Sequence, residues 1–374
     1  MAALGPWLVD RYQALGIVGH LPKDFTPINT FKSHEIQFKN RIRNCEDILL
    51  DENLALAVLS CDAGRDQWNT VMGTFRPHEN LANGRLYLYD YAKTGSKEEK
   101  KLRQLTFVNF PNENDFHPLG IELDPETSTL YAVSHAQAGS CIEIFQLSIK
   151  AATLTHVQTF RHPLIHAPNS IRSLGNSKLY VTNDHMFRAR VSPLLAKVET
   201  FSGLPGGTVV YTDTQRPETT KIVARVPFAN GIAELNSTTF AVASSSKAGV
   251  YLYEVQADHN LKFKSWFRTQ AAVDNLSVDS DGTLLLSGHA SALALMKVSK
   301  GRGTCDPNSD IQKEREACQC TAPSWAAQWT EKDGLKTLYK GKDFCSSTTM
   351  VRDVKRGVAM ISGLYENGIM VIKE

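Results

Sequence analysis

The sequence predicts an all-β protein, a six-bladed β-propeller with a short N-terminal lead-in segment. One pattern of strand, turn and strand occurs six times along the 374 residues. Equivalent positions in successive copies lie 45 to 73 residues apart, and periods of about 40 to 50 residues with several strands each are typical of propellers. The longer intervals leave room for inserted loops. We therefore expect residues 1–40 to form the lead-in and residues 41–374 to form the propeller.

Each copy begins with polar residues, continues into an apolar strand, and returns through a turn into a second apolar strand. The first strands fall within residues 45–50, 117–123, 168–171, 228–232, 272–278 and 346–350. The second strands fall within residues 54–60, 130–135, 179–185, 239–244, 283–289 and 358–363. The copies are aligned on Glu46, Leu119, Asn169, Asn230, Asn275 and Ser347.

The fifth copy shows the pattern most clearly. Asp274 and Asn275 precede an alternating strand, Asp281 and Gly282 form a turn, and a second strand ends at His289. This is a β-hairpin with polar, metal-competent side chains at one end. Because each copy begins at the same place in its blade, the first residues of the copies converge on the central channel.

Five of these polar residues have the composition of a site for a hard cation. Calcium is bound by six to eight oxygen atoms from carboxylates, amide carbonyls and water. Two carboxylates and three amides come from four copies, with neither histidine nor cysteine among them, which argues against zinc. They are Glu46, Asn169, Asn230, Asp274 and Asn275. Taken singly, each of the Asn and Asp residues could instead cap a turn.

Composition excludes some classes of partner. The 41 basic and 39 acidic residues give a formal net charge of +2, so no overall field favours nucleic acid. Residues 3–8 are apolar, but Asp10 and Arg11 follow, so the run is too short to span a membrane. Two interpretations of this segment stay open. It is either a short amphipathic lead-in that lies on the propeller or on a membrane surface, or the beginning of a chain that lacks its original start. The sequence does not define an oligomeric state.

The seven cysteines leave at least one thiol unpaired in a monomer. For Cys305, Cys318 and Cys320 we weigh a disulfide within residues 300–321, free thiols, and a metal site, for which one C-x-C is a weak signal. The cysteines do not identify the cellular compartment. The protein could be secreted or reside in the endoplasmic reticulum, or it could be cytoplasmic.

Several motifs resemble the serum paraoxonase and arylesterase family of calcium-dependent lactonases, a group of six-bladed propellers within a wider set that includes gluconolactonases. The motifs are Glu46-Asp47, Pro168-Asn169, Thr182-Asn183-Asp184-His185, Phe228-Ala229-Asn230-Gly231-Ile232, residues 273–279 and Gly288-His289. The resemblance runs from about Cys45 to the C-terminus. It implies that Glu46, Asn169, Asn230, Asp274 and Asn275 hold a catalytic calcium ion, with Asp47 at a second, structural ion.

The chain departs from this family at two positions. Ser170 stands where the family has an acidic ligand of the structural ion, so the second site is expected to be weaker or empty. Leu119 stands where the family has its proposed catalytic histidine, and His117 lies two residues earlier. Because residues two apart share a face of a regular strand, His117 is the candidate replacement.

The expected function is hydrolysis of a lactone or aryl ester, in which calcium polarises the carbonyl and a histidine activates water. His117, His135, His185 and His289 are the candidate bases, and Asp184 is a candidate to orient one of them. The alternatives are a metal-assisted cyclase or isomerase and a non-catalytic ligand-binding propeller. Residues 64–68, in the loop over residues 64–75, and residues 186–188 suggest a partly aromatic, partly cationic rim suited to an apolar ester or a carboxylate product.

Overall fold

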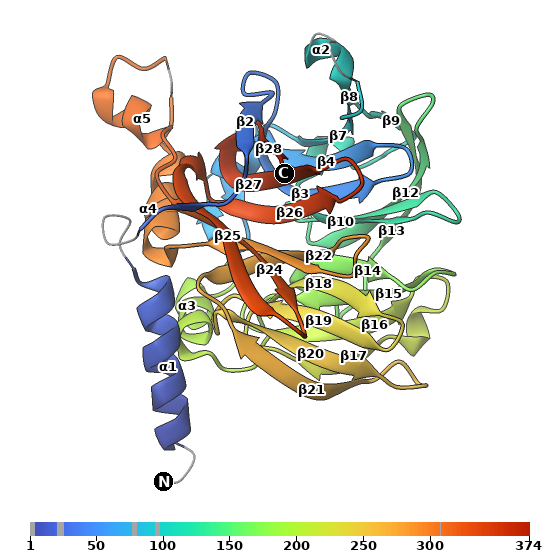
Figure 1. Ribbon diagram of the computed structural model, residues 1–374. Coiled ribbons are helices and arrows are strands. Elements are labelled where there is room, and N and C mark those ends of the chain that lie inside the picture. The colour runs from blue at the N-terminus through green and yellow to red at the C-terminus, as the bar shows by residue number, and fades with distance from the viewer. Residues whose placement is uncertain (1–3, 21–25, 77–80, 94–97, 307) are drawn as a thin grey trace.

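The computed structural model describes residues 4–20, 26–76, 81–93, 98–306 and 308–374. Its β-sheets are arranged around a central axis, as in a propeller (Figure 1). This confirms the all-β, propeller-like architecture that the repeats predict.

Four sheets of the described chain are separate antiparallel blades of four strands, two of them extended by a fifth strand. The first contains β10 (Pro118–Asp124), β11 (Thr129–Ser134), β12 (Cys141–Ser148) and β13 (Thr153–Phe160), extended by β9 (Thr106–Val108). The second contains β14 (Pro168–Ser173), β15 (Lys178–Asn183), β16 (Thr208–Asp213) and β17 (Lys221–Arg225). The third contains β18 (Ala229–Asn236), β19 (Thr239–Ser244), β20 (Gly249–Val255) and β21 (Leu261–Arg268). The fourth contains β22 (Ala272–Val278), β23 (Leu284–His289), β24 (Pro323–Thr330) and β25 (Gly334–Cys345), extended by β1 (Ile28–Asn29).

A further sheet contains eight strands and departs from the expected six separate blades. One half consists of β3 (Arg43–Asp51), β4 (Leu56–Asp62), β7 (Gly84–Asp90) and β8 (Leu102–Gln104). The other half consists of β26 (Ser347–Asp353), β27 (Val358–Asn367), β28 (Ile369–Lys373) and β2 (Ser33–Gln37). Pairing of β27 with β3, where Gly363 faces Cys45 and Asn367 faces Arg43, joins the halves. The described chain therefore has four separate blades and this joined sheet.

The inner strands form a closed ring. β3, β10, β14, β18, β22 and β26 each contact the next in that order, and β26 contacts β3 again. Apolar side chains fill the space between neighbouring sheets; Leu86 and Leu88 of β7, for example, pack with Leu130 and Phe145. The ring thus brings together the six segments that the repeats identified.

Every ring strand carries a β-bulge near its start, where two of its residues face one residue of the partner strand. The paired residues are Glu46 and Asp47, Leu119 and Gly120, Asn169 and Ser170, Asn230 and Gly231, Asp274 and Asn275, and Thr348 and Thr349. A bulge re-aims side chains that strict alternation would send to opposite faces. The equivalents of Glu46 in the last two copies are therefore Asp274 and Thr348, one residue away from the expected Asn275 and Ser347.

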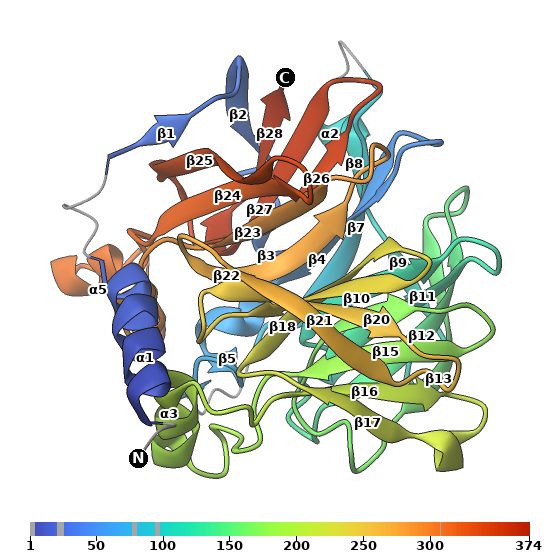
Figure 2. The same cartoon turned by 60° about the horizontal axis from the view of Figure 1, so that its bottom comes forward.

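Helices gather at one end of the ring. α1 (Leu4–Val18) lies beside α3 (Pro193–Ser202) (Figure 2), and its Val18 packs in one apolar cluster with Ala292 of α4 (Ala292–Arg302). The remaining helical elements are α2 (Glu98–Lys101), α5 (Gln312–Ala317) and the 3₁₀ turns η2 (Ala63–Asp66), η3 (Glu113–Asp115) and η4 (Pro217–Thr219). A small two-stranded sheet of β5 (Trp68–Asn69) and β6 (Thr74–Phe75) follows η2.

The expected lead-in over residues 1–40 is built into the molecule rather than separate from it. β1 pairs with β25 and β2 pairs with β28. Trp7 of α1 donates a hydrogen bond to the backbone of Ser202, and Asp10 forms ion pairs with Lys247 and Arg268. Residues 1–3 and 21–25 of this segment lie outside the described residues. None of the described helices is long and apolar enough to cross a membrane.

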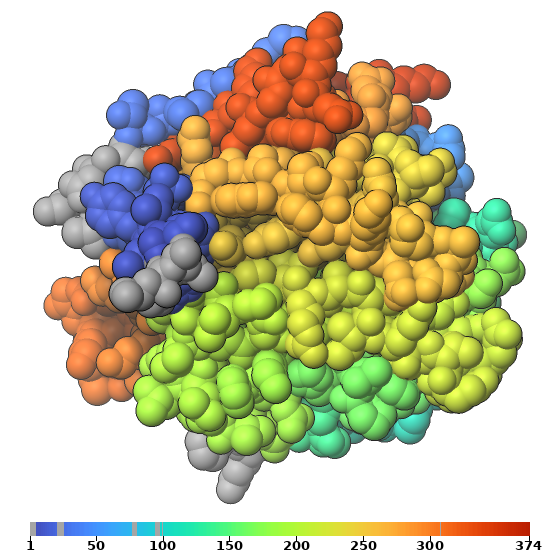
Figure 3. Space-filling view, turned by 90° about the horizontal axis from the view of Figure 1, so that it is seen from below, coloured from blue at the N-terminus to red at the C-terminus, as the bar shows by residue number. Residues whose placement is uncertain are grey.

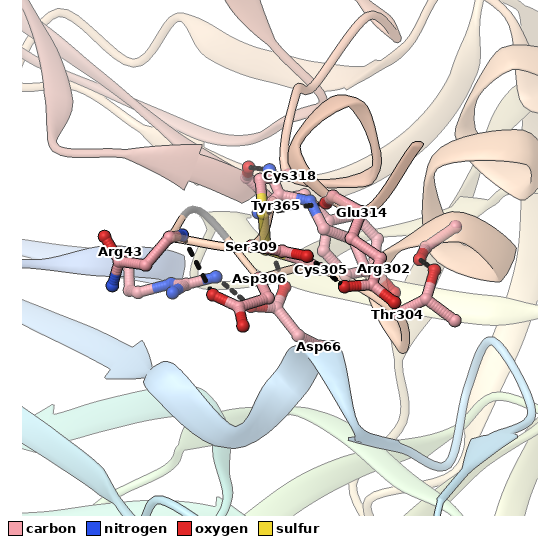
Figure 4. Close-up of a disulfide and its surroundings, with 12 residues drawn as sticks. Arg43, Asp66, Arg302, Thr304, Cys305, Asp306, Ser309, Glu314, Cys318 and Tyr365 are labelled. Carbon is pink, nitrogen blue, oxygen red and sulfur yellow. Dashed lines mark hydrogen bonds and ion pairs between the residues drawn. A yellow bond between two sulfur atoms is a disulfide. The ribbon is translucent and has the colours of Figure 1, made fainter. Parts of the chain in front are cut away.

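All seven cysteines lie in the described residues, and six of them form disulfides: Cys45–Cys61, Cys305–Cys318 and Cys320–Cys345. The bond between Cys305 and Cys318 confirms the disulfide alternative for residues 300–321 (Figure 4). Cys141 is buried and unpaired, as the odd count requires.

Candidate metal and substrate site

The five predicted ligand residues meet at one end of the ring. Glu46, Asn169, Asn230 and Asp274 line one cavity of about 120 Å³, which we call the channel cavity. Asn275 joins them through its Nδ2, which donates to Oε1 of Glu46 at 2.9 Å. All five side chains are at least nine-tenths buried. The bulges explain this convergence, because they turn the side chains at the start of each ring strand toward the axis.

Four oxygen atoms of this group are buried and accept no hydrogen bond from any described residue. They are Oε2 of Glu46 and Oδ1 of Asn169, Asn230 and Asn275. The amide nitrogens of two of these residues are engaged: Asn230 donates to Oγ of Ser245 at 3.0 Å, and Asn275 donates to Glu46 and to Oγ1 of Thr349. Buried polar atoms are nearly always paired. Three of these oxygens belong to residues of the channel cavity and the fourth to Asn275 of the adjacent part of the channel, and such a set fits the oxygen ligands of a hard cation.

The electrostatics of the site agree with this interpretation. Burial raises the pKa of the Glu46 carboxyl well above its usual value, and the nearby Asp47 and Asp274 carboxyls raise it further. A cation would offset this concentration of negative charge. Among the described residues no group of three His, Cys, Asp or Glu has metal-binding geometry. The donor set is rich in amide oxygens, which fits calcium rather than zinc.

Asp47 is already hydrogen-bonded within the protein. Its Oδ1 accepts from the backbone of Ile48 and from Oγ1 of Thr349, and its Oδ2 accepts from the backbone of Ile121 at 2.9 Å. Ser170, the residue that replaces a carboxylate of the related family, lies in the adjacent part of the channel with Asp47. Unlike the four oxygens above, both carboxylate oxygens of Asp47 are therefore already paired within the protein.

Among the candidate bases, His289 lines the channel cavity. Its Nε2 lies 2.9 Å from Oδ2 of Asp274. Its Nδ1 is buried and has no hydrogen-bond partner among the described residues. One ring nitrogen of this histidine therefore contacts a carboxylate, and the other is unpaired and lies in a residue beside the predicted ligands.

His117 lies elsewhere, because the bulge between Pro118 and Ile121 interrupts the alternation of β10. Leu119 lines the channel cavity and His117 does not. The Nδ1 of His117 lies 3.2 Å from Oδ2 of Asp62, and both residues are buried. The expectation that His117 shares the face of Leu119 is therefore wrong.

His135, His185 and Asp184 line a neighbouring cavity of about 370 Å³, the side cavity. The Nε2 of His135 donates to the carbonyl of Pro168 at 2.6 Å, and burial lowers the pKa of this histidine. His185 bonds Asp184 at 2.9 Å and Thr200 at 2.6 Å. Burial alone would lower the pKa of His185, but the hydrogen bond and charge of Asp184 outweigh it and raise the value. Nδ1 of His135 is hydrogen-bonded to the hydroxyl of Thr70, so both histidines have both ring nitrogens occupied.

Sequence patterns did not identify the apolar walls of the channel cavity, which come from elements far apart in the chain. Leu15 and Val18 come from α1, Phe201 from α3, and Leu295 and Met296 from α4. Arg65 in η2 is the buried cation of this wall. The only sequence signal for it was the predicted rim formed by the loop over residues 64–75.

Comparisons with known proteins agree with the motif resemblance. The family model described as Arylesterase matches residues 72–313. Serum paraoxonase/lactonase 3 of Oryctolagus cuniculus is 26% identical over 307 residues, which cover 80% of this chain and 79% of the relative. Serum paraoxonase/arylesterase 2 of Rattus norvegicus is 32% identical over 260 residues, which cover 68% of each chain.

The fold also resembles a solved structure of low sequence identity. The luciferin-regenerating enzyme is 11% identical, and the match covers 93% of this chain and 96% of that one with a TM-score of 0.55. The arrangement of sheets is therefore shared well beyond recognisable sequence similarity. The matched family model covers more than half of the chain, and the chain belongs to the arylesterase family.

Proposed function

We propose that this protein is a calcium-dependent hydrolase of lactones or aryl esters. The observation that carries the proposal is the set of four buried, unpaired oxygens from four ring strands beside the channel cavity. Membership of the arylesterase family supports the reaction class. The names of the relatives, paraoxonase, lactonase and arylesterase, support the substrate class.

Glu46, Asn169, Asn230, Asp274 and Asn275 would hold the ion. When bound, calcium supplies a Lewis acid that polarises an ester carbonyl and stabilises the oxyanion formed on it. The hydrogen bond from Asn275 fixes Oε1 of Glu46, which leaves Oε2 directed to the shared space. Asp47 and Ser170 would at most hold a weak second ion, because the oxygens of Asp47 already accept three hydrogen bonds.

His289 is the general base in this proposal. With its ring proton on Nε2, 2.9 Å from Oδ2 of Asp274, the imidazole would carry its lone pair on Nδ1, the nitrogen without a partner. Nδ1 takes a proton from the attacking water, and the imidazolium returns it to the leaving alkoxide or phenoxide. His135, His185 and Asp184 support neighbouring structure, because their polar atoms bond Pro168, Thr200 and one another outside the channel cavity. Nε2 of His117 is also buried without a hydrogen-bond partner among the described residues, but His117 does not line the channel cavity.

Aryl esters and aliphatic lactones, assayed with calcium and with a chelator, test the proposal. Hydrolysis that the chelator abolishes and calcium restores is the expected result. Calcium binding without any hydrolysis would favour a cyclase or isomerase, and absence of calcium binding would favour a ligand-binding propeller. Glu46→Gln should abolish calcium binding, whereas Glu143→Gln, at an equally buried glutamate that bonds Asn112, His156 and Thr159 away from the channel, should retain it.

The ring also supports six blades as the underlying architecture. The eight-stranded sheet divides into two four-stranded halves, each of which begins with one ring strand. Counting each half as one blade gives one blade for each of the six sequence repeats.

The helical end of the molecule supports peripheral contact with a membrane. α1 forms part of the outer surface next to the segment that contains α3 (Figure 3). Leu8 and Val9 of α1 are more than half exposed, as are Leu194 and Val198 of α3. Sedimentation with phosphatidylcholine vesicles tests this contact: the double substitution Leu8→Asp and Val9→Asp should release the protein, and Leu54→Asp, at an exposed leucine in the turn between β3 and β4, should not.

A further inference from the structure

Arg65 occupies an inward position that the local backbone requires. It lies in η2, where the side chain of Asp62 caps the turn by accepting from the backbone of Gly64 at 2.9 Å. A Cβ on Gly64 would lie 2.1 Å from the carbonyl oxygen of Ala82, so this tight turn excludes any other residue there. The turn directs Arg65 into the wall of the channel cavity, where only 3% of the residue is exposed.

The guanidinium of Arg65 forms no ion pair with a carboxylate of the described residues, although its charge works against the rise in the pKa of the Glu46 carboxyl in the same cavity. Its Nη2 donates to the carbonyl of Pro118 at 2.7 Å, and its Nε is buried without any partner. The two carboxylates adjacent in sequence are committed elsewhere. Asp62 bonds Gly64 and His117, and Asp66 lies between Arg43 and Arg302 (Figure 4). A buried, unpaired cation is costly, so a group that binds it from the cavity is expected.

The charge of the cavity favours an anion as that group. Glu46 and Asp274 contribute two negative charges, which a bound divalent cation balances. Arg65 then remains as one positive charge in a cavity whose walls are otherwise largely apolar. A guanidinium presents several N–H donors in a plane and pairs well with the two oxygens of a carboxylate.

We propose, on the basis of the proposed hydrolysis, that Arg65 is a specificity-determining residue. It binds a carboxylate that the substrate carries separately from the reacting carbonyl. The substrates of this protein are accordingly esters or lactones that carry an anionic group within reach of both the cation site and Arg65. Neutral esters are hydrolysed without this contact and bind less tightly.

Steady-state kinetics with phenyl acetate and 4-acetoxybenzoate compare a neutral ester with its carboxylated counterpart. Arg65→Gln should lower kcat/KM for the carboxylated ester about 10- to 100-fold, mainly through KM, and change that for phenyl acetate less than about threefold. Arg65→Lys should give an intermediate loss, because it keeps the charge without the planar donors. Arg190→Gln is the matched control: Arg190 is exposed, stacks over Trp68 at 5.1 Å, and should affect neither ester.

Equal losses on both esters, or no loss on either, would overturn the assignment, because a residue that merely balances the charge of Glu46 acts on all substrates alike. If Arg65→Gln does not fold, Arg65→Lys provides the same comparison. Calorimetric titration of benzoate and benzamide into the calcium-loaded protein separates this inference from the hydrolysis itself. If benzoate binding depends on Arg65 but neither ester is hydrolysed, the anion site is supported and the proposed function is rejected. If both esters are hydrolysed but Arg65→Gln leaves benzoate binding unchanged, the proposed function is supported and the anion site is rejected.

Discussion

Nε2 of His289 and Oδ2 of Asp274 lie 2.9 Å apart, on adjacent strands of one blade. In the ladder His289 faces Ala272, and the bulge that follows Val273 turns Asp274 toward the channel and the imidazole. The sequence motifs contain both residues, but their contact depends on the bulge. One carboxylate thereby serves both the predicted ion and the predicted base.

Replacing His289 with glutamine should lower kcat for aryl ester hydrolysis by about 100-fold, because a positioned general base contributes about that much or more. Calcium affinity should change by less than about threefold, since the ligand oxygens remain in place. Steady-state kinetics and calcium titration of the same preparation measure the two effects separately.

His117→Gln is the matched control for this prediction, since His117 is equally buried, also lies beside an aspartate, and is absent from the channel cavity. Its kcat should stay within about fivefold of the unmodified protein. A large loss in His117→Gln together with normal activity in His289→Gln would assign the base to His117 instead.

Calcium should stabilise the folded protein as well as activate it. An ion present at about 100 times its dissociation constant adds about 2.7 kcal/mol to the free energy of unfolding when it binds the native state alone. Thermal denaturation with calcium and with a chelator measures this difference, which Glu46→Gln should remove. Identical melting curves under the two conditions would contradict a bound ion at the four unpaired oxygens.

Much of this site was predictable because the repeats mark the start of each ring strand. Glu46, Asn169, Asn230 and Asp274 were identified from their place in the pattern, and the structure brings them to one cavity. The alignment of the last two copies was wrong by one residue, because several polar residues stand side by side at both strand starts and the sequence does not show which of them matches Glu46. The bulge in β10 separated His117 from the face of Leu119 and has no sequence signal of its own.

Features that depend on contacts between distant segments were not predictable. The pairing of Gly363 with Cys45 joins the two ends of the ring into one sheet, and no local pattern encodes it. The cavity wall combines Val18, Arg65 and Met296 from separate regions of the chain. Which of four histidines faces the ligands is likewise decided by packing rather than by spacing.

The cysteine pairing predicts a definite count of reactive thiols. Protein denatured without reductant should take up one iodoacetamide group, at Cys141, and protein denatured after reduction should take up seven. Native protein should resist alkylation, because Cys141 is fully buried and burial raises the pKa of its thiol. Intact-mass measurement gives the counts, and three or more groups on the unreduced chain would show that at least one disulfide is absent.

Docking of α1 should depend on the charge of Asp10. Burial alone would raise the pKa of Asp10, but Lys247, Arg11 and Arg268 outweigh it and lower the value to about 2. Because the folded pKa lies below that of an unfolded aspartate, near 3.9, the stabilisation is present above about pH 4 and is lost as the pH falls toward 2. For a group partly open to solvent this amounts to about 1 kcal/mol.

Amide hydrogen exchange of residues 4–18 tests this docking. Protection should fall between pH 4 and pH 2 after correction for the intrinsic exchange rate, and Asp10→Asn should show reduced protection already at pH 7. Asp310→Asn, at an exposed aspartate, is the control and should leave the exchange of α1 unchanged. If Asp10→Asn protected α1 as well as the unmodified chain does at pH 7, the ion pairs with Lys247 and Arg268 would not hold the helix, and the hydrogen bond from Trp7 and the apolar contact of Val18 would have to suffice.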